Sequence, residues 1–134
     1  MLLQSSDTLS PPASLTRLSG KRVLVVEDEA LIAMLAEEML GELGCIIHAV
    51  APTVPKALAL VEAGGFDLAL LDVNVARERV FPVAEALAAR GIPFAFASGY
   101  GEQGLRDDFK GRPLVGKPYS GTQLEKALLA ALAG

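Results

Sequence analysis

The segment LALLDVN, residues 68–74, decides the fold, because four apolar residues run without a polar break into an acid. A strand that is apolar on both faces is typical of the interior of a parallel sheet with helices on each side. The segment VLVVEDE, residues 23–29, has the same form. The sequence therefore predicts a buried parallel sheet whose strands end on carboxylates.

Short apolar runs alternate along the chain with segments in which apolar residues recur every three or four positions. This alternation is typical of βα units built around a parallel sheet. The predicted strands are Val23–Val26, Cys45–Val50, Leu68–Leu71, Phe94–Ala97 and Leu114–Val115. The predicted helical faces span Ile32–Leu43, Val54–Val61, Val80–Leu87 and Leu124–Leu132, with a weak fifth helix at Glu102–Phe109. Thr53 is a candidate N-cap, and Ser120 with Gln123 has capping-box spacing.

Five strands and five helices in strict alternation, joined by right-handed crossovers, predict an α/β fold: a flavodoxin-like doubly wound (βα)5 sheet with strand order 2-1-3-4-5. Residues 21–134 form this single domain. Residues 1–20 are rich in Ser, Thr and Pro without a sustained period, which predicts a flexible N-terminal arm whose few leucines dock locally. The weak Glu102–Phe109 segment is expected to be the least stable element.

The composition excludes several classes of protein. The chain has 134 residues, of which 51% are apolar, and 12 basic against 16 acidic residues give a net charge of −4. This balance argues against nucleic acid or an anionic membrane as a partner. The single cysteine, Cys45, excludes disulfides within the chain, and no Cys/His cluster suggests structural zinc. We therefore expect a cytoplasmic protein, a monomer or a weak dimer.

Side chains that can bind a metal or take part in catalysis follow four of the five predicted strands. Glu27 and Asp28 follow the first strand, Asp72 the third, Ser98 the fourth and Lys117 the fifth. In doubly wound sheets, ligands bind at these strand ends. Carboxylates gathered there repel one another unless a hard cation such as Mg²⁺ neutralises them. The same grouping suits phosphoryl transfer to a carboxylate, with Asp72 as the nucleophile.

The ordered set VLVVEDE, LALLDVN, FAFASGY and GKPYS, spread over residues 20–134, resembles the receiver domain of bacterial two-component response regulators. The resemblance implies that Asp72 accepts a phosphoryl group from a histidine kinase or phosphotransfer protein. It also implies that Glu27, Asp28, Asp72 and the backbone carbonyl of Asn74 hold Mg²⁺. Ser98 and Lys117 are then expected to contact the phosphoryl group.

The segment PFAFASGYG, residues 93–101, resembles the Phe-Ala-Thr-Gly-Tyr motif of alphaproteobacterial receivers, many of which stand alone, with Ser98 in place of the usual Thr. Typical receivers have an aromatic residue three positions before the lysine, where this chain has Leu114. The resemblance implies Tyr100 as the switch residue instead.

These observations predict a single-domain response regulator, part of a phosphorelay, whose only catalysis is its own phosphotransfer and dephosphorylation. One predicted helix follows Lys117, so we expect it to signal by protein–protein interaction, on the last helices, or to act as a phosphate sink or shuttle. One alternative is an aspartyl-nucleophile phosphatase for small substrates, but such an enzyme needs an acid where Asn74 stands. Another is a flavin- or nucleotide-binding module, which needs a phosphate cradle where the acids 27–29 stand.

Overall fold

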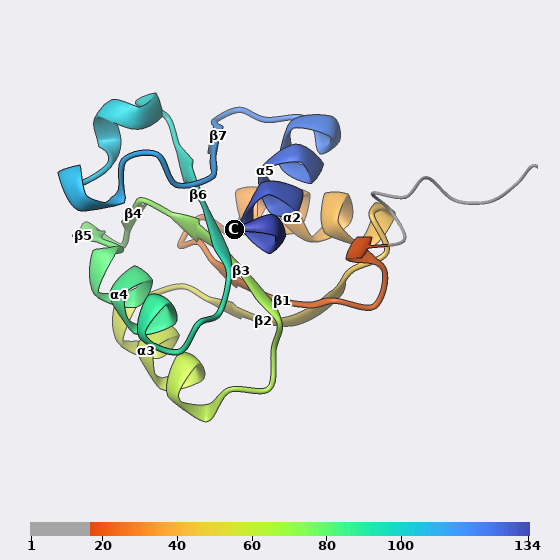
Figure 1. The fold of residues 1–134 in the computed structure, drawn as a ribbon, viewed down its shortest axis with the longest axis horizontal. Helices are drawn as coiled ribbons and strands as arrows, with labels where there is room; N and C mark the ends of the chain where they lie inside the picture. The colour runs from red at the N-terminus through yellow and green to blue at the C-terminus, as the bar shows by residue number, and fades with distance from the viewer. Residues whose placement is uncertain (1–16) are drawn as a thin grey trace, which may run out of the picture.

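The computed structural model describes residues 17–134, and their five-stranded parallel sheet lies between two layers of helices (Figure 1). The strand order is β2-β1-β3-β6-β7, and every neighbouring pair is parallel. The bounds are β1 Arg22–Val26, β2 Ile46–Ala51, β3 Leu68–Asp72, β6 Phe94–Ser98 and β7 Leu114–Gly116. Counted along the chain, these strands have the order 2-1-3-4-5, so the predicted flavodoxin-like fold is confirmed.

The two faces of the sheet carry separate apolar cores. Helices α3 and α4 pack on the face that includes Leu24 and Val26 of β1, whereas α2 and α5 pack on the face that includes Val23 and Val25. The helices are α2 Ala30–Glu42, α3 Val54–Ala63, α4 Phe81–Ala89 and α5 Gly121–Ala133. The three central strands are therefore buried on both faces, as expected from their unbroken apolar runs. The edge strand β2 is more open, because Ile46 is exposed.

The predicted helix starts are present. Thr53 Oγ1 accepts a hydrogen bond of 3.3 Å from the Lys56 N–H at the start of α3. Ser120 and Gln123 form a reciprocal capping box at the start of α5. Each cap satisfies backbone groups that have no partner inside the helix.

The crossover from β6 to β7 differs from the expected fifth helix. It contains two single turns of 3₁₀-helix, η1 Gly101–Gly104 and η2 Asp107–Phe109. Between these turns, Leu105 and Arg106 have extended backbone, with ψ of 144° and 148°, which interrupts the expected helix. Leu105 and Phe109 nevertheless anchor the crossover in the core.

A hairpin that the strand and helix patterns do not predict follows β3. It pairs β4 Asn74–Val75 with β5 Glu78–Arg79 in antiparallel register. Its two turn residues, Ala76 and Arg77, have φ of 51° and 69°. A two-residue turn with both φ values positive favours Asn and Gly, so this hairpin forms with unsuitable turn residues.

The domain begins before residue 21. Leu18 falls within the predicted arm and is completely buried beside Leu40 and Cys45, in line with the expected docking of the leucines of the arm. The backbone N–H of Gly20 donates to the Gly44 carbonyl at 2.8 Å. Residues 17–20 are therefore packed on the domain, and the rest of the predicted arm lies outside the described residues. Among residues 17–134, no helix is long and apolar enough to cross a membrane.

Candidate functional site

Four strand ends bring polar side chains to one edge of the sheet. Asp72 and Ser98 are the last residues of β3 and β6, Glu27 follows β1, and Lys117 follows β7. In a parallel sheet all carboxyl ends lie at the same edge, so side chains distant in sequence meet there. Glu27, Asp72 and Ser98 are buried at this edge, which removes them from most of the surrounding water.

The predicted acidic residues lie together. Glu27, Asp28 and Asp72 each offer a carboxylate oxygen, and these oxygens all lie within 4.8 Å of one another. Asp28 is exposed, so the cluster opens to solvent on its side. A set of hard oxygen donors that is open on one side suits a cation that keeps several water ligands, as Mg²⁺ does.

Lys117 is the positive charge of the cluster. Its Nζ atom lies 3.1 Å from Glu27 Oε1 and 3.4 Å from Asp72 Oδ2. The other Glu27 oxygen accepts a hydrogen bond of 3.2 Å from the Glu29 backbone N–H. The lysine therefore neutralises part of the negative charge of two buried carboxylates and holds their positions.

The environment changes the proton affinity of these groups. Burial and the charge of Asp72 raise the pKa of Glu27 above its ordinary value. Burial also raises the pKa of Asp72, although Lys117 opposes the change. Burial alone would lower the pKa of Lys117, but the charges of Asp72 and Glu27 outweigh it and raise that pKa. The lysine thus stays protonated, while burial disfavours the charged form of the two acids.

Ser98 and Tyr100 lie at the same edge but differ in orientation. The Ser98 hydroxyl accepts a hydrogen bond of 3.0 Å from the Tyr100 backbone N–H. The Tyr100 side chain is 73% exposed, so its ring projects into solvent and away from the core. Asn74 opens β4 two residues after Asp72, and its side chain is exposed as well.

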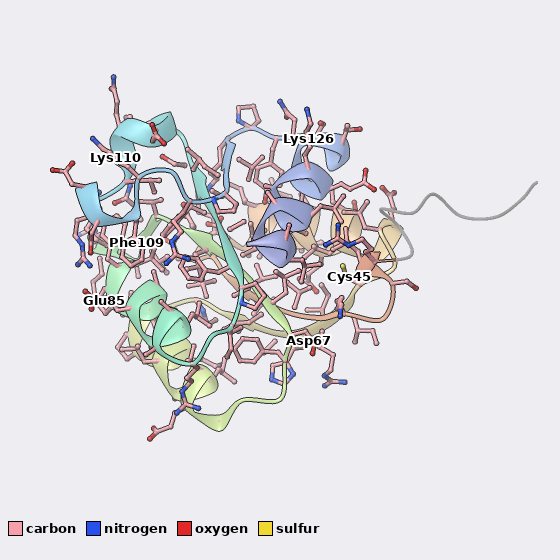
Figure 2. The ribbon with its side chains drawn as sticks, viewed as in Figure 1. Cys45, Asp67, Glu85, Phe109, Lys110 and Lys126 are labelled. Atoms are coloured by element: carbon pink, nitrogen blue, oxygen red, sulfur yellow. The ribbon has the colours of Figure 1, made fainter. Side chains whose placement is uncertain are left out.

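Cys45, His48 and Tyr119 also carry polar or reactive groups, and each makes structural contacts. Cys45 is buried on the side of the fold where the described chain begins, and its thiol lies 3.6 Å from the Leu18 carbonyl oxygen (Figure 2). His48 packs against Phe66 with ring centres 5.3 Å apart and the ring planes tilted by 36°. Tyr119 lines an apolar groove of about 330 Å³ beside α2, and burial raises its pKa.

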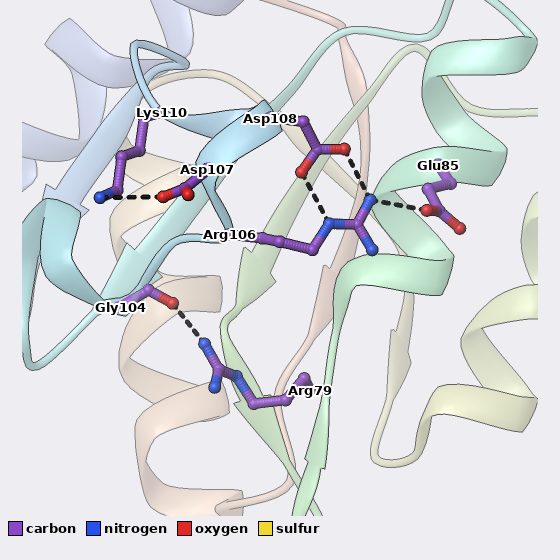
Figure 3. A network of polar contacts seen from close by, with 7 residues as sticks. All are labelled: Arg79, Glu85, Gly104, Arg106, Asp107, Asp108 and Lys110. Atoms are coloured by element: carbon purple, nitrogen blue, oxygen red, sulfur yellow. Dashed lines mark hydrogen bonds and ion pairs between the residues drawn. The ribbon is translucent and has the colours of Figure 1, made fainter.

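Two residues near the site carry no signal in the sequence. Arg79 of the β4–β5 hairpin donates to the Gly104 carbonyl oxygen at 2.6 Å (Figure 3). A Cβ atom added to Gly104 would lie 2.6 Å from Ser98 Oγ, so this glycine lies directly against the hydroxyl. The contact depends on the hairpin and on the irregular crossover, which periodicity does not reveal.

Comparison with known proteins identifies the class. No protein-family model matches the chain. A curated relative, the transcriptional regulatory protein PdtaR of Mycobacterium tuberculosis, is 32% identical over 116 residues, which cover 84% of this chain and 57% of that protein. The chain thus spans about half the length of the curated relatives it matches.

The chain spans nearly the whole length of several solved structures. SdrG from Sphingomonas melonis Fr1 is 46% identical, with a TM-score of 0.77 over 84% of this chain and 97% of SdrG. A second structure, of the BeF3-activated conformation of SdrG from Pseudomonas melonis Fr1, is 44% identical, with a TM-score of 0.72 over 85% of this chain and 98% of that one. The receiver domain of the response regulator PhyR from Erythrobacter litoralis is 28% identical, with a TM-score of 0.76 over 87% of this chain and 93% of that domain. The chain belongs to the receiver domains of response regulators.

Proposed function

We propose that this protein is a phosphoacceptor that takes a phosphoryl group on Asp72 from a phosphohistidine of a histidine kinase or phosphotransfer protein. The observation that supports this proposal is the position of the Asp72 carboxylate. It lies 3.4 Å from Lys117 Nζ and within 4.8 Å of oxygens from Glu27 and Asp28. A nucleophilic carboxylate, a cation site and a fixed ammonium together are what phosphoryl transfer to an acid requires.

In the proposed reaction, an Asp72 carboxylate oxygen attacks the phosphorus of the phosphohistidine. The new O–P bond forms an acyl phosphate while the N–P bond breaks, and the imidazole leaves with the bonding pair and takes a proton. Lys117 and the Ser98 hydroxyl donate hydrogen bonds to the phosphoryl oxygens. Hydrolysis by water later restores the free carboxylate and releases inorganic phosphate.

Glu27, Asp28, Asp72 and the backbone carbonyl of Asn74 are the proposed ligands of Mg²⁺. The fit rests on the donor set, which consists of hard oxygens with a net negative charge in a partly buried cluster. When bound, Mg²⁺ neutralises charge on the transferred group. Lys117, with Nζ 3.4 Å from Asp72 Oδ2, also neutralises charge there, and its charge opposes the rise in the pKa of Asp72 that burial causes.

The signalling role follows from the same site. Phosphorylation adds negative charge and acceptor oxygens beside Ser98, and the crossover after β6 contacts this residue. We propose that the modified surface binds another protein, or that the chain serves as a phosphate sink or shuttle. A relative has a structure described as BeF3-activated, and we propose that this chain binds the same phosphoryl mimic.

The test uses a small phosphodonor such as acetyl phosphate, with Mg²⁺, and intact-mass spectrometry. The wild type is expected to gain one phosphoryl group, and peptide mapping should locate it at Asp72. Asp72→Asn is expected to gain none, whereas the matched control Asp107→Asn, at a fully exposed acid, should behave as the wild type. A phosphoryl group on Asp72→Asn, or steady turnover of phosphate esters by the wild type, would overturn the proposal.

A further inference from the structure

Arg79 connects two loops beside the acidic cluster. It is the last residue of β5, and its Nη2 atom donates to the Gly104 carbonyl oxygen at 2.6 Å (Figure 3). Its guanidinium carbon also lies 5.1 Å from the centre of the Phe81 ring. A planar cation over an aromatic face is held in orientation, so the side chain is fixed from two directions.

Gly104, which accepts the hydrogen bond from Arg79, also lies against Ser98. A Cβ at Gly104 would lie 2.6 Å from Ser98 Oγ, so the backbone of η1 packs directly against the hydroxyl. The same hydroxyl accepts a hydrogen bond of 3.0 Å from the Tyr100 N–H. Within residues 17–134, no other hydrogen bond of the Ser98 hydroxyl is present. The hydroxyl is therefore oriented toward the crossover after β6.

The hairpin that carries Arg79 is attached to the segment that follows Asp72. In the β4–β5 hairpin, Arg79 pairs directly with Asn74, which stands two residues after Asp72. The Val80 N–H donates to the Val73 carbonyl at 2.9 Å, so the end of the hairpin is tied back to the residue after β3. The guanidinium thus joins the segment that follows Asp72 to the segment that packs on Ser98.

We propose that Arg79 is a positioning residue that, through the Gly104 carbonyl, holds η1 against Ser98 and keeps the hydroxyl turned away from Asp72. This inference rests on the proposed function, in which Ser98 contacts a phosphoryl group on Asp72. For that contact the hydroxyl must turn from the crossover to Asp72, and a serine side chain does so by a rotamer change. While Arg79 holds Gly104 in place, rotation of the Ser98 hydroxyl toward Asp72 is opposed. The Arg79–Gly104 hydrogen bond therefore sets how readily Ser98 contacts a phosphoryl group on Asp72.

The test is a titration with beryllofluoride and Mg²⁺, followed by calorimetry, on the full chain. Arg79→Ala is expected to bind the mimic about fivefold more tightly, since one hydrogen bond that favours the resting orientation is lost. Arg77→Ala removes the same charge from the same hairpin and is expected to bind as the wild type. Arg79→Lys keeps a donor for the carbonyl, so its affinity should return toward the wild-type value.

A double-mutant cycle shows whether the effect passes through Ser98. In a Ser98→Ala background there is no hydroxyl to orient, so adding Arg79→Ala should leave the affinity unchanged. A general loosening of the fold would instead produce the same change in both backgrounds. If Arg79→Ala does not bind more tightly, or if its gain persists without the hydroxyl, the inference is wrong.

A second measurement needs no phosphoryl mimic and so separates this inference from the proposed function. In the free protein, the Tyr100 amide is expected to exchange with solvent faster in Arg79→Ala than in Arg77→Ala, because its acceptor is no longer held. Equal exchange rates in the two variants would overturn the link. If the wild type takes neither mimic nor phosphoryl group, the proposed function fails, and the exchange rates still decide whether Arg79 positions Ser98.

Discussion

Lys117 and Glu27 stand 90 positions apart in the sequence, yet Nζ of the lysine lies 3.1 Å from Oε1 of the glutamate. Both side chains are largely buried, so each charge depends on the other for compensation. Asp72 shares the same ammonium at 3.4 Å. Without a cation, Lys117 is thus the group that offsets the repulsion between the two acids.

Lys117→Met is therefore expected to destabilise the metal-free protein. Removing the ammonium leaves two buried carboxylates without a counter-charge, which should lower the free energy of unfolding by about 2–3 kcal/mol. Urea denaturation at pH 7 in a chelator measures the change. Lys126→Met, at an exposed lysine of α5, is the control and should have little effect. Mg²⁺ should reduce the deficit of Lys117→Met, and a deficit unaffected by Mg²⁺ would contradict the assignment of the acids to a metal.

The raised pKa values of Glu27 and Asp72 predict a dependence of stability on pH. A raised pKa means that the folded protein holds the proton more tightly than the unfolded chain, so stability falls as pH rises through the folded pKa. In a chelator, Asp72→Asn is expected to be more stable than the wild type at pH 7. This advantage should disappear below the unfolded pKa, near 3.8. Unfolding curves across this pH range test the sign, and a less stable Asp72→Asn at pH 7 would refute it.

The strand ends could be predicted from the sequence because each has a local signal. An apolar run that stops on an acid marks both a buried strand and its carboxyl end, as at Val26 and Leu71. A parallel sheet then brings those ends together whatever their separation along the chain. The sequence alone therefore predicts that Glu27, Asp72 and Lys117 converge.

The contacts around Ser98 could not be predicted in the same way. They depend on a two-residue turn at Ala76 and Arg77 and on 3₁₀ turns at residues 101–109, neither of which has an apolar period. Gly104, which packs on Ser98, is the last residue of one of these 3₁₀ turns. Tertiary packing sets the shape of these irregular segments, so the apolar periodicity of the sequence does not predict this part of the site.

The β4–β5 hairpin provides a stability test of its turn. Ala76 and Arg77 both have positive φ, a conformation that costs roughly 1 kcal/mol for residues with a Cβ and that Asn and Gly adopt more easily. Replacing Ala76-Arg77 by Asn-Gly is expected to raise the free energy of unfolding by about 1 kcal/mol. Chemical denaturation measures the gain. The same pair placed in reverse order, Gly-Asn, should gain less, and a loss of stability with Asn-Gly would show that the turn is not of this type.

A substitution at Leu18 tests whether the domain begins before residue 21. It is completely buried against Leu40 and Cys45, so Leu18→Ala should lower the free energy of unfolding by about 2–4 kcal/mol. Leu31→Ala, at a leucine of α2 that is 68% exposed, is the control and should change stability little. A Leu18→Ala variant as stable as this control would show that the domain starts after residue 20.

Cys45 supplies an independent measurement of the same contact. Burial raises the pKa of its thiol to about 11, and the thiolate is the reactive form, so a thiol reagent at pH 8 should react slowly with the folded protein. The thiol lies 3.6 Å from the Leu18 carbonyl oxygen, and losing the leucine side chain opens the packing around it. Leu18→Ala should therefore speed the labelling of Cys45 under conditions where Leu31→Ala leaves the rate unchanged. Because Cys45 is the only cysteine of the chain, the labelling rate reports opening at this corner of the fold alone.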